Sequence, residues 1–528
     1  FENLAFGDTF SGNKHTLSGR YATKNWMIWS NSSVMKSDSE LSNSSFSRSQ
    51  NRSSYKLGKN WIGATVNLED NSEKLKTTNT FSALSQRFIE YGAFVGRGDS
   101  TKVFVELGFL QRQNDSLQNN RIDRVNHSNS YYLKSQLIKT EKSNLSVFLN
   151  YRTLKYEDSN LKDEPSLNSR ILYSDRFFGQ LLQTTTAYET SSGTIAQQEF
   201  TYLQVEPGQG VYMWNDYNGN GIQELQEFEI APYPDLAIYV RVFLPNQVFV
   251  RTHQNKFSQS VNINFNQWQN EKGFKKFASH FYNQTSFLID RKIRRNGSNF
   301  DLNPFSKEEE ALIGLNTNFR SSLFFNRGKQ HHSTTYSFLF NESQNLLSVG
   351  SVSAKNLSHQ LQYQHLVDKS WLFNFSGSKT LTNSTSENYP TRNFEIDSYQ
   401  IEPKIGYLFS KNASWDIFYE FQQKENKIGA FEILKQTRLG TSFTFNSEKG
   451  FSMNGEFSMY NNLYDGNALS AVGFQMLEGL QPGKNQTWRI LLKKNLTQFL
   501  DLNINYQGRN SETSKTIHTG NVQLRAFF

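Results

Sequence analysis

Twelve residues near the middle of the chain, 216–227, carry oxygen-bearing side chains at the spacing that a metal-binding loop requires. They read Asp-Tyr-Asn-Gly-Asn-Gly-Ile-Gln-Glu-Leu-Gln-Glu and match the pattern D-x-[DN]-x-[DN]-G-x5-E at every specified position. A hard cation such as Ca²⁺ takes six to eight oxygen ligands, and a tight loop turns alternate side chains inward. The spacing therefore predicts a structural calcium site.

Each position of the pattern has its own task. Gly221 makes the sharp turn, Glu224 binds directly or through a water molecule, and Glu227 closes the site with both carboxylate oxygens. The alternative is a polar Asn/Gly turn that holds no ion. The predicted ligands are Asp216, Asn218, Asn220, the backbone carbonyl of Ile222, Glu224 and Glu227.

These twelve residues resemble the calcium loop of EF-hand, dockerin and related proteins, and the resemblance ends at the loop. The preceding residues 211–214 are strand-like, and Pro232 ends any helix that follows. Asn at the third and fifth positions gives the loop less negative charge than Asp would. The resemblance, with these departures, implies a structural site with a dissociation constant on the order of 10⁻⁴–10⁻³ M rather than a sensor.

Most of the remaining chain alternates apolar and polar residues with a period of two. Segments 102–109, 145–152 and 415–422 show it, and polar Asn/Ser/Gly stretches separate such segments. Hydrophobic residues make up 36% of the chain and aromatic residues 14%, a composition that suits strands with one lipid-facing side and aromatic girdles. No apolar run approaches the ~20 residues of a spanning helix. We therefore predict an all-β fold, a large antiparallel transmembrane β-barrel of roughly 22–26 strands.

The last residues form a strand with an apolar face, made of Val522, Leu524, Ala526 and Phe528. A barrel needs its final strand to pair with its first, because an open edge is unstable in lipid. This ending resembles the closing strand of bacterial outer-membrane β-barrels. The Asn/Ser-rich, cysteine-free style of the chain is similar to large outer-membrane proteins of Bacteroidota. The resemblance implies a location in the bacterial outer membrane.

Composition divides the chain into three parts. We expect the first part of the barrel at 1–190, an insertion with the calcium loop at 191–257, and the second part at 258–528. Proline is concentrated in the insertion and removes donors that a central strand would need. The four prolines there are Pro207, Pro232, Pro234 and Pro245.

The apolar run 236–244 has two sets of interpretations. It forms a surface patch that docks a partner or a segment that plugs the lumen, or else it forms a buried strand that covers the calcium loop or lengthens the next barrel strand. Tight turns at 326–329, 367–370 and 447–450 are typical of the periplasmic side, whereas strand parity counted from the C-terminus places them outside. One element between Gly450 and Asn495 is therefore miscounted.

At the N-terminal end, Phe1 implies that a leader has been removed or that more sequence precedes it.

Other chemistry finds little support in the sequence. There is no Cys, and no nucleophile-elbow, Walker, zincin or dinucleotide pattern, so we predict no enzyme. The net charge of +8 is dispersed, which argues against nucleic-acid binding. The adjacent pair His331 and His332 lies beside a predicted turn, and such a pair makes a poor metal site because adjacent residues point to opposite faces of a strand.

A barrel of the predicted width cannot fill its lumen with its own side chains. One hypothesis is a transport or export pore, or the membrane subunit of a larger translocation assembly. The alternative is a non-conducting surface scaffold or adhesion platform that binds proteins through its calcium-ordered insertion and loops. Both expect outer-membrane lipid, and other outer-membrane or surface proteins, as partners.

Overall fold

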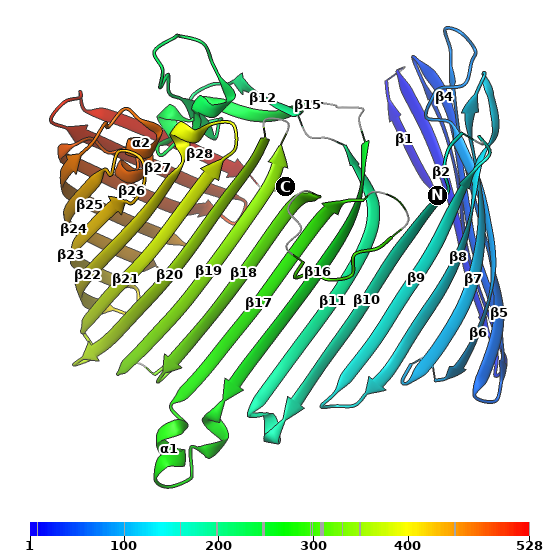
Figure 1. Ribbon diagram of the computed structural model, residues 1–528, viewed down its shortest axis with the longest axis horizontal. Helices are drawn as coiled ribbons and strands as arrows, with labels where there is room; N and C mark the ends of the chain where they lie inside the picture. Colours follow the sequence, from blue (N-terminus) through cyan, green and yellow to red (C-terminus); the bar gives the residue numbers. More distant parts are fainter. Residues whose placement is uncertain are drawn as a thin grey trace.

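The computed structural model shows one large curved antiparallel sheet with a small second sheet at its rim (Figure 1). It describes residues 1–7, 9–99, 101–158, 160–196, 199–244, 249–295, 297, 299–306, 311–329, 331–347, 350–447 and 450–526. The large sheet has 24 strands and the small one four. Strands consecutive along the chain pair with each other, and β11 pairs with β16 across the insertion.

The strands of the large sheet are β1 Glu2–Phe6, β2 Phe10–Ala22, β3 Trp26–Ser39, β4 Ser42–Leu57, β5 Asn60–Leu75, β6 Gln86–Gly98, β7 Phe104–Gln118, β8 Arg121–Lys139, β9 Asn144–Tyr156, β10 Glu164–Phe177, β11 Leu182–Ala196, β16 Phe249–Asn264, β17 Phe281–Arg294, β18 Leu312–Phe325, β19 His332–Leu347, β20 Gly350–Val367, β21 Trp371–Ser386, β22 Phe394–Ser410, β23 Ala413–Asn426, β24 Ile433–Ser447, β25 Phe451–Asp465, β26 Gly483–Thr497, β27 Leu500–Ser511 and β28 Ile517–Ala526. The helices are α1 Phe274–Ala278 and α2 Ala471–Leu477, with single 3₁₀ turns at Phe178–Gln180, Leu225–Glu227, Pro234–Leu236, Phe265–Trp268 and Pro390–Arg392.

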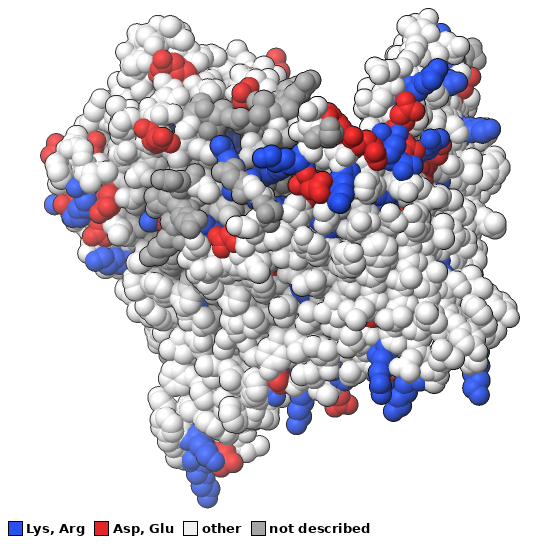
Figure 2. Space-filling model, turned by 45° about the vertical axis from the view of Figure 1, so that its right-hand side comes forward, with Lys and Arg blue, Asp and Glu red and all other residues white. Residues whose placement is uncertain are grey.

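Alternate residues of each strand meet different environments. On β23, Trp415, Ile417 and Tyr419 are 44–46% exposed, whereas Phe418 and Glu420, on the other face, are each 6% exposed. Figure 2 shows the convex side of the sheet as a band with few charged side chains, between two rims that carry them. The convex face is therefore apolar, and the polar residues of the strands face the interior.

This arrangement confirms the predicted all-β fold, and the 24 strands fall within the predicted range. Strands of 13–19 residues, which make up most of the sheet, exceed the 9–11 residues that a tilted strand needs to cross a bilayer. No helix among the described residues is long and apolar enough to span a membrane. An antiparallel sheet with a continuous apolar exterior and a polar interior belongs in a bacterial outer membrane.

The two rims of the sheet differ. We call the rim with two- and three-residue connections such as 58–59, 368–370 and 411–412 the tight-turn rim, although it also carries α1. The opposite loop rim carries the insertion and α2. Strand order places the predicted turns 326–329, 367–370 and 447–450 on the tight-turn rim. Strand β28 also ends on this rim. Within the last of these turns, Glu448 and Lys449 lie outside the described residues. Helix α2, between β25 and β26, is the element that strand counting from the sequence misread.

The predicted pairing of the last strand with the first is not found among the described ladders. β28 pairs with β27 along its length, and β1 pairs with β2. Val522, Leu524 and Ala526 are exposed, as a lipid-facing row would be, and Phe528 lies outside the described residues. The alternation of apolar and polar residues predicts which face of a strand meets lipid, but it does not determine which strands pair with it on either side.

On the interior face, large rings lie over glycines of the neighbouring strand. A Cβ atom added to Gly96 would lie 2.1 Å from the ring of Trp61, its direct partner in the register. Only glycine leaves room for such a ring to lie flat against the next strand. The same relation holds for Phe94 over Gly63, Tyr132 over Gly108 and Phe418 over Gly440.

Candidate functional site

The insertion is a compact four-stranded antiparallel sheet between β11 and β16. Its strands, in sheet order, are β12 Glu199–Gln204, β15 Tyr239–Leu244, β13 Tyr212–Trp214 and β14 Phe228–Ile230. The barrel ladder between β11 and β16 continues as far as Ala196 and Phe249. The insertion is therefore shorter at both ends than the predicted 191–257.

Aromatic side chains hold this small sheet together. The rings of Tyr202 and Phe228 stack with centroids 4.0 Å apart, and Tyr239 meets Phe228 edge-on at 5.0 Å. Part of the apolar run 236–244 forms β15, and its Tyr239 hydroxyl accepts a hydrogen bond of 2.8 Å from Gln223 in the loop 216–227. The run thus forms a strand that contacts the candidate cation loop, one of the predicted alternatives.

Asp216 organises the first half of the candidate cation loop. Its Oδ1 accepts backbone N–H bonds from Gly219 at 2.7 Å and Asn220 at 3.1 Å, and its Oδ2 accepts one from Gly221 at 2.8 Å. Gly219 and Gly221 have φ of +72° and +70°, which glycine adopts without strain. The side-chain oxygens of Asn218 and Asn220 each accept from the backbone two residues on, at 2.9 and 2.7 Å. The predicted turn is therefore formed by local hydrogen bonds.

Glu227 closes the loop from a buried position, with 1% of its surface exposed. Its Oε2 accepts the indole N–H of Trp214 at 2.8 Å, and its Oε1 accepts the backbone N–H of Tyr217 at 3.2 Å. These bonds fix the carboxylate against the start of the loop without using all of its lone pairs. A buried carboxylate with neutral donors only is costly, and a nearby cation would lower that cost.

The other predicted ligands lie at the surface. Glu224 accepts the side-chain amide of Asn218 at 2.8 Å, so the third and ninth loop positions meet. Ile222 is 63% exposed, and its backbone N–H is bound by Asn220. Among the described residues, the loop carboxylates do not form a set whose ligand oxygens all lie within 4.8 Å of one another. Asp216 and Glu227 therefore hold the two ends of the loop in place, and Glu224 is bonded to the first half of the loop through the side chain of Asn218.

The exit of the loop is attached to the barrel. Arg392, in the connection between β21 and β22, donates to the carbonyl of Gln226 and to Glu229 Oε1, the latter at 2.5 Å. Tyr217 also donates to Glu229, at 3.3 Å. Burial raises the pKa of Glu229 above its usual range, and the nearby Arg392 opposes that shift. The carbonyl of Gln226, two residues before β14, and the side chain of Glu229, in the middle of β14, are thus both held by one barrel arginine.

A second attachment reaches the far side of the sheet. Asp235 accepts two hydrogen bonds of 2.6 Å from the guanidinium of Arg509, on the interior face of β27. The same guanidinium lies 4.1 Å from the ring centroid of Tyr233. Arg509 holds the pKa of Asp235 below its usual range, mainly through hydrogen bonding. The insertion therefore extends from β11 and β16 to strands near the end of the chain.

These two attachments could not be predicted from the local sequence. Arg392 follows a proline in a polar connection, and Arg509 is one of several polar residues on its strand face. Nothing in either local pattern indicates a partner in the insertion. Arg392 and Arg509 contact the insertion only because the tertiary fold brings distant parts of the chain together.

No protein-family model matches this chain, and no curated protein matches it. Among solved structures, the ferric preacinetobactin receptor BauA from Acinetobacter baumannii is similar at 10% identity, over 98% of this chain and 76% of its own, with a TM-score of 0.33. The ferric-catecholate import receptor Fiu from E. coli K12 is similar at 8% identity, over 94% and 75%, with a TM-score of 0.31. The siderophore receptor PirA from Pseudomonas aeruginosa is similar at 7% identity, over 96% and 81%, with a TM-score of 0.33. Likenesses at this level carry no argument about the function of this chain.

Proposed function

We propose that the protein is an outer-membrane transport or export pore, or the membrane subunit of a translocation assembly, and that the insertion is a lid over its mouth. A sheet of 24 strands encloses more space than its own side chains fill. The observation that carries the proposal is the bond between Asp235 and Arg509, which joins the insertion to β27, far around the sheet from β11 and β16.

The attachments suit a lid that opens. Each rests on one ion pair, and the side chains of Asp235 and Arg509 are 23% and 17% exposed. An ion pair that keeps partial contact with water contributes little enough free energy to break and re-form. Because longer loops in such barrels face outward and short turns face the periplasm, the lid lies on the extracellular side.

Calcium is the proposed structural cofactor of the lid. Ligands at Asp216 and Glu227 would fix the start and end of the loop, and Glu229 follows Glu227 by two residues. Ordering the end of the loop would hold Glu229 in place for Arg392. The protein supplies Asp216, Asn218, Asn220, the carbonyl of Ile222, Glu224 and Glu227 for this purpose.

Planar-bilayer conductance tests the pore. We expect small or rare openings from the full chain in the presence of calcium, and a large stable conductance after residues 199–244 are replaced by a short Gly/Ser linker. A matched variant that shortens the loop-rim connection 76–85, between β5 and β6, should leave the conductance at the level of the full chain. A barrel that stays sealed without the insertion would contradict the pore.

The second candidate function is a non-conducting scaffold that binds outer-membrane or surface proteins. Apolar side chains on the insertion favour it: Leu203, Val211 and Ile230 are 51–67% exposed. Exposed apolar side chains that join into one patch would form a protein-binding surface. The scaffold would be supported over the pore by three results together. Stable partners would co-purify with the full chain, these partners would be lost after Ile230→Ser, and the barrel would conduct no ions.

A further inference from the structure

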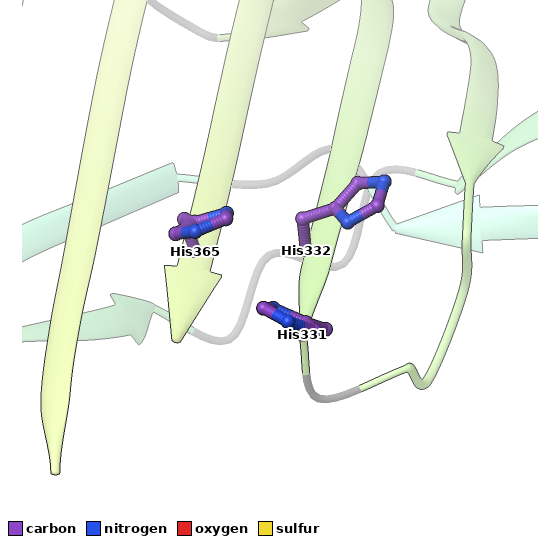
Figure 3. Close-up of side chains that lie close together, drawn as sticks. All are labelled: His331, His332 and His365. Carbon is purple, nitrogen blue, oxygen red and sulfur yellow. The ribbon is translucent and has the colours of Figure 1, made fainter. Parts of the chain in front are cut away.

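Three histidines meet at the tight-turn rim, on the apolar face of the sheet. His332 begins β19, and His365 lies directly opposite it on β20. His331 immediately precedes β19. One ring nitrogen from each can be chosen so that all three lie within 4.8 Å of one another, and Figure 3 shows the three side chains close together. Among the described residues, no carboxylate belongs to this group.

The meeting corrects the prediction from the adjacent pair. Alternation would send His331 and His332 to opposite faces only if both were inside a strand. His331 lies in the connection, where its carbonyl accepts the backbone N–H of Leu366 at 2.8 Å. Its side chain is therefore free of the strand period, and the third histidine comes from a different strand.

Neighbouring side chains orient two of the rings. The amide of Asn326 lies 2.8 Å from His332 Nε2 and 2.6 Å from His280 Nδ1. In the structure the amide nitrogen of Asn326 donates to His332 Nε2, and its oxygen accepts the Nδ1–H of His280. Rotating the amide by half a turn lets its oxygen accept an Nε2–H from His332, which leaves His332 Nδ1 free for a metal ion. The Tyr363 hydroxyl lies 3.2 Å from His365 Nδ1 and can accept its proton, which leaves Nε2 free. Hydrogen bonds of this kind orient histidine ligands in metal sites.

We propose that His331, His332 and His365 bind a divalent transition-metal ion of the Zn²⁺, Ni²⁺ or Cu²⁺ class. Imidazole suits these metals, whereas Ca²⁺ and Mg²⁺ prefer oxygen. Bonds of about 2.0–2.1 Å to a tetrahedral ion would place the nitrogens about 3.4 Å apart, so the rings must close by about 1 Å. His331 and His332 are exposed at the rim, which leaves room for this movement and for water as a further ligand. The ion would join the start of β19 to the end of β20.

The test is a titration of the chelator-treated full chain in detergent with CoCl₂, followed by visible absorption, and with ZnCl₂, followed by calorimetry. We expect about one ion per chain and visible bands of nitrogen-bound Co²⁺. His365→Gln should abolish both signals. Asn326→Ala, which removes the amide that orients His332, should weaken binding about tenfold.

His359→Gln is the matched control. His359 lies on the same face of β20, six residues from His365, and its Nδ1 lies 2.8 Å from the Tyr336 hydroxyl. This variant should bind as the unchanged chain does. Heat-modifiable migration on gels checks that each variant forms its barrel. The proposal would be overturned if the unchanged chain bound neither Co²⁺ nor Zn²⁺ at millimolar metal. It would also be overturned if a folded His365→Gln variant bound as much metal as the unchanged chain, or if His359→Gln lost as much binding as His365→Gln.

Discussion

Asp235 in the insertion accepts two hydrogen bonds of 2.6 Å from Arg509 on β27, although 274 residues separate them in the sequence. Thr519 on β28 also donates to Asp235, at 3.4 Å. One carboxylate thus joins the insertion to the last two strands of the sheet. This contact makes the insertion a bridge across the loop rim rather than a free appendage.

Replacing Asp235 by Asn should loosen the lid. The amide loses the charge that makes the paired hydrogen bonds strong, at a cost of about 1–2 kcal/mol for a partly buried pair. The open population should rise about tenfold, because 1.4 kcal/mol corresponds to a factor of ten. Single-channel recording measures this as a higher open probability at unchanged unit conductance. Asp158→Asn, in another loop-rim connection, is the control and should leave the open probability as it is.

Acid should detach the lid through Asp235. Its pKa is lowered by Arg509, so this attachment is complete above the ordinary aspartate pKa of about 3.9 and is lost as the pH falls through the lowered value. Glu229 acts in the opposite direction: its pKa is raised by burial, so the attached state gains relative stability as the pH falls through that raised value. We therefore expect the lid to stay attached on mild acidification and to open only below about pH 4.

Spin labels on cysteines introduced at Ile230 and Lys515 can follow this change, because the chain has no cysteine of its own. The distance between the labels should be constant from pH 7 to about 5 and should broaden below about pH 4. Asp235→Asn should already show the broad distribution at pH 7. Detachment of the unchanged chain near pH 6 would contradict the assignment to Asp235.

Calcium removal should expose the loop to protease. Without the ion, the carboxylates of Asp216 and Glu227 lose their shared counter-charge, and residues 206–235 should be cleaved faster while the barrel stays intact. Mass spectrometry of the fragments with and without a chelator measures this. Asp216→Ala should be cleaved quickly even with millimolar calcium, since it also loses the acceptor for three backbone N–H groups. Chelator-independent cleavage of the unchanged chain would argue for a metal-free turn.

Gly96→Ala should destabilise the barrel. Its new Cβ would lie 2.1 Å from the ring of Trp61, and that ring would have to leave the position from which its N–H donates to Glu106 at 3.0 Å. Overpacking of this kind costs about 1–3 kcal/mol. The midpoint of urea unfolding in detergent should fall accordingly. Gly455→Ala, in β25, has no atom within 4 Å of the new Cβ and should leave the midpoint unchanged.

The fold was accessible from sequence because its determinant is local. The period of two on β23, with Trp415 and Ile417 on one face and Glu420 on the other, depends on each residue and its nearest neighbours. Helix α2 was missed because it is only seven residues long. Its burial against Ile396 and Leu434 comes from strands distant in the chain. Short helices of this kind depend on tertiary contacts for their stability.

The candidate sites divide in the same way. The turn at Asp216 could be predicted because its hydrogen-bond partners lie within five residues. The ion pairs of Arg392 and Arg509 could not be predicted, since a basic residue in a polar stretch has many conceivable partners. The histidine group was half visible: the adjacent pair stood out, and the register of β19 and β20 supplied His365.

The rings that lie flat over glycines also have a bearing on what can pass through the interior. Trp61, Phe94, Tyr132 and Phe418 lie along the wall, each over a glycine of the next strand, instead of reaching across the enclosed space. An arginine covers two of these rings: the guanidinium of Arg52 lies 3.7 Å from the ring centroid of Phe94, and that of Arg438 lies 4.6 Å from the ring centroid of Phe418. Phe94 and Phe418 are accordingly only 2% and 6% exposed. A solute that moved along this part of the wall would therefore meet guanidinium groups and not the aromatic rings beneath them.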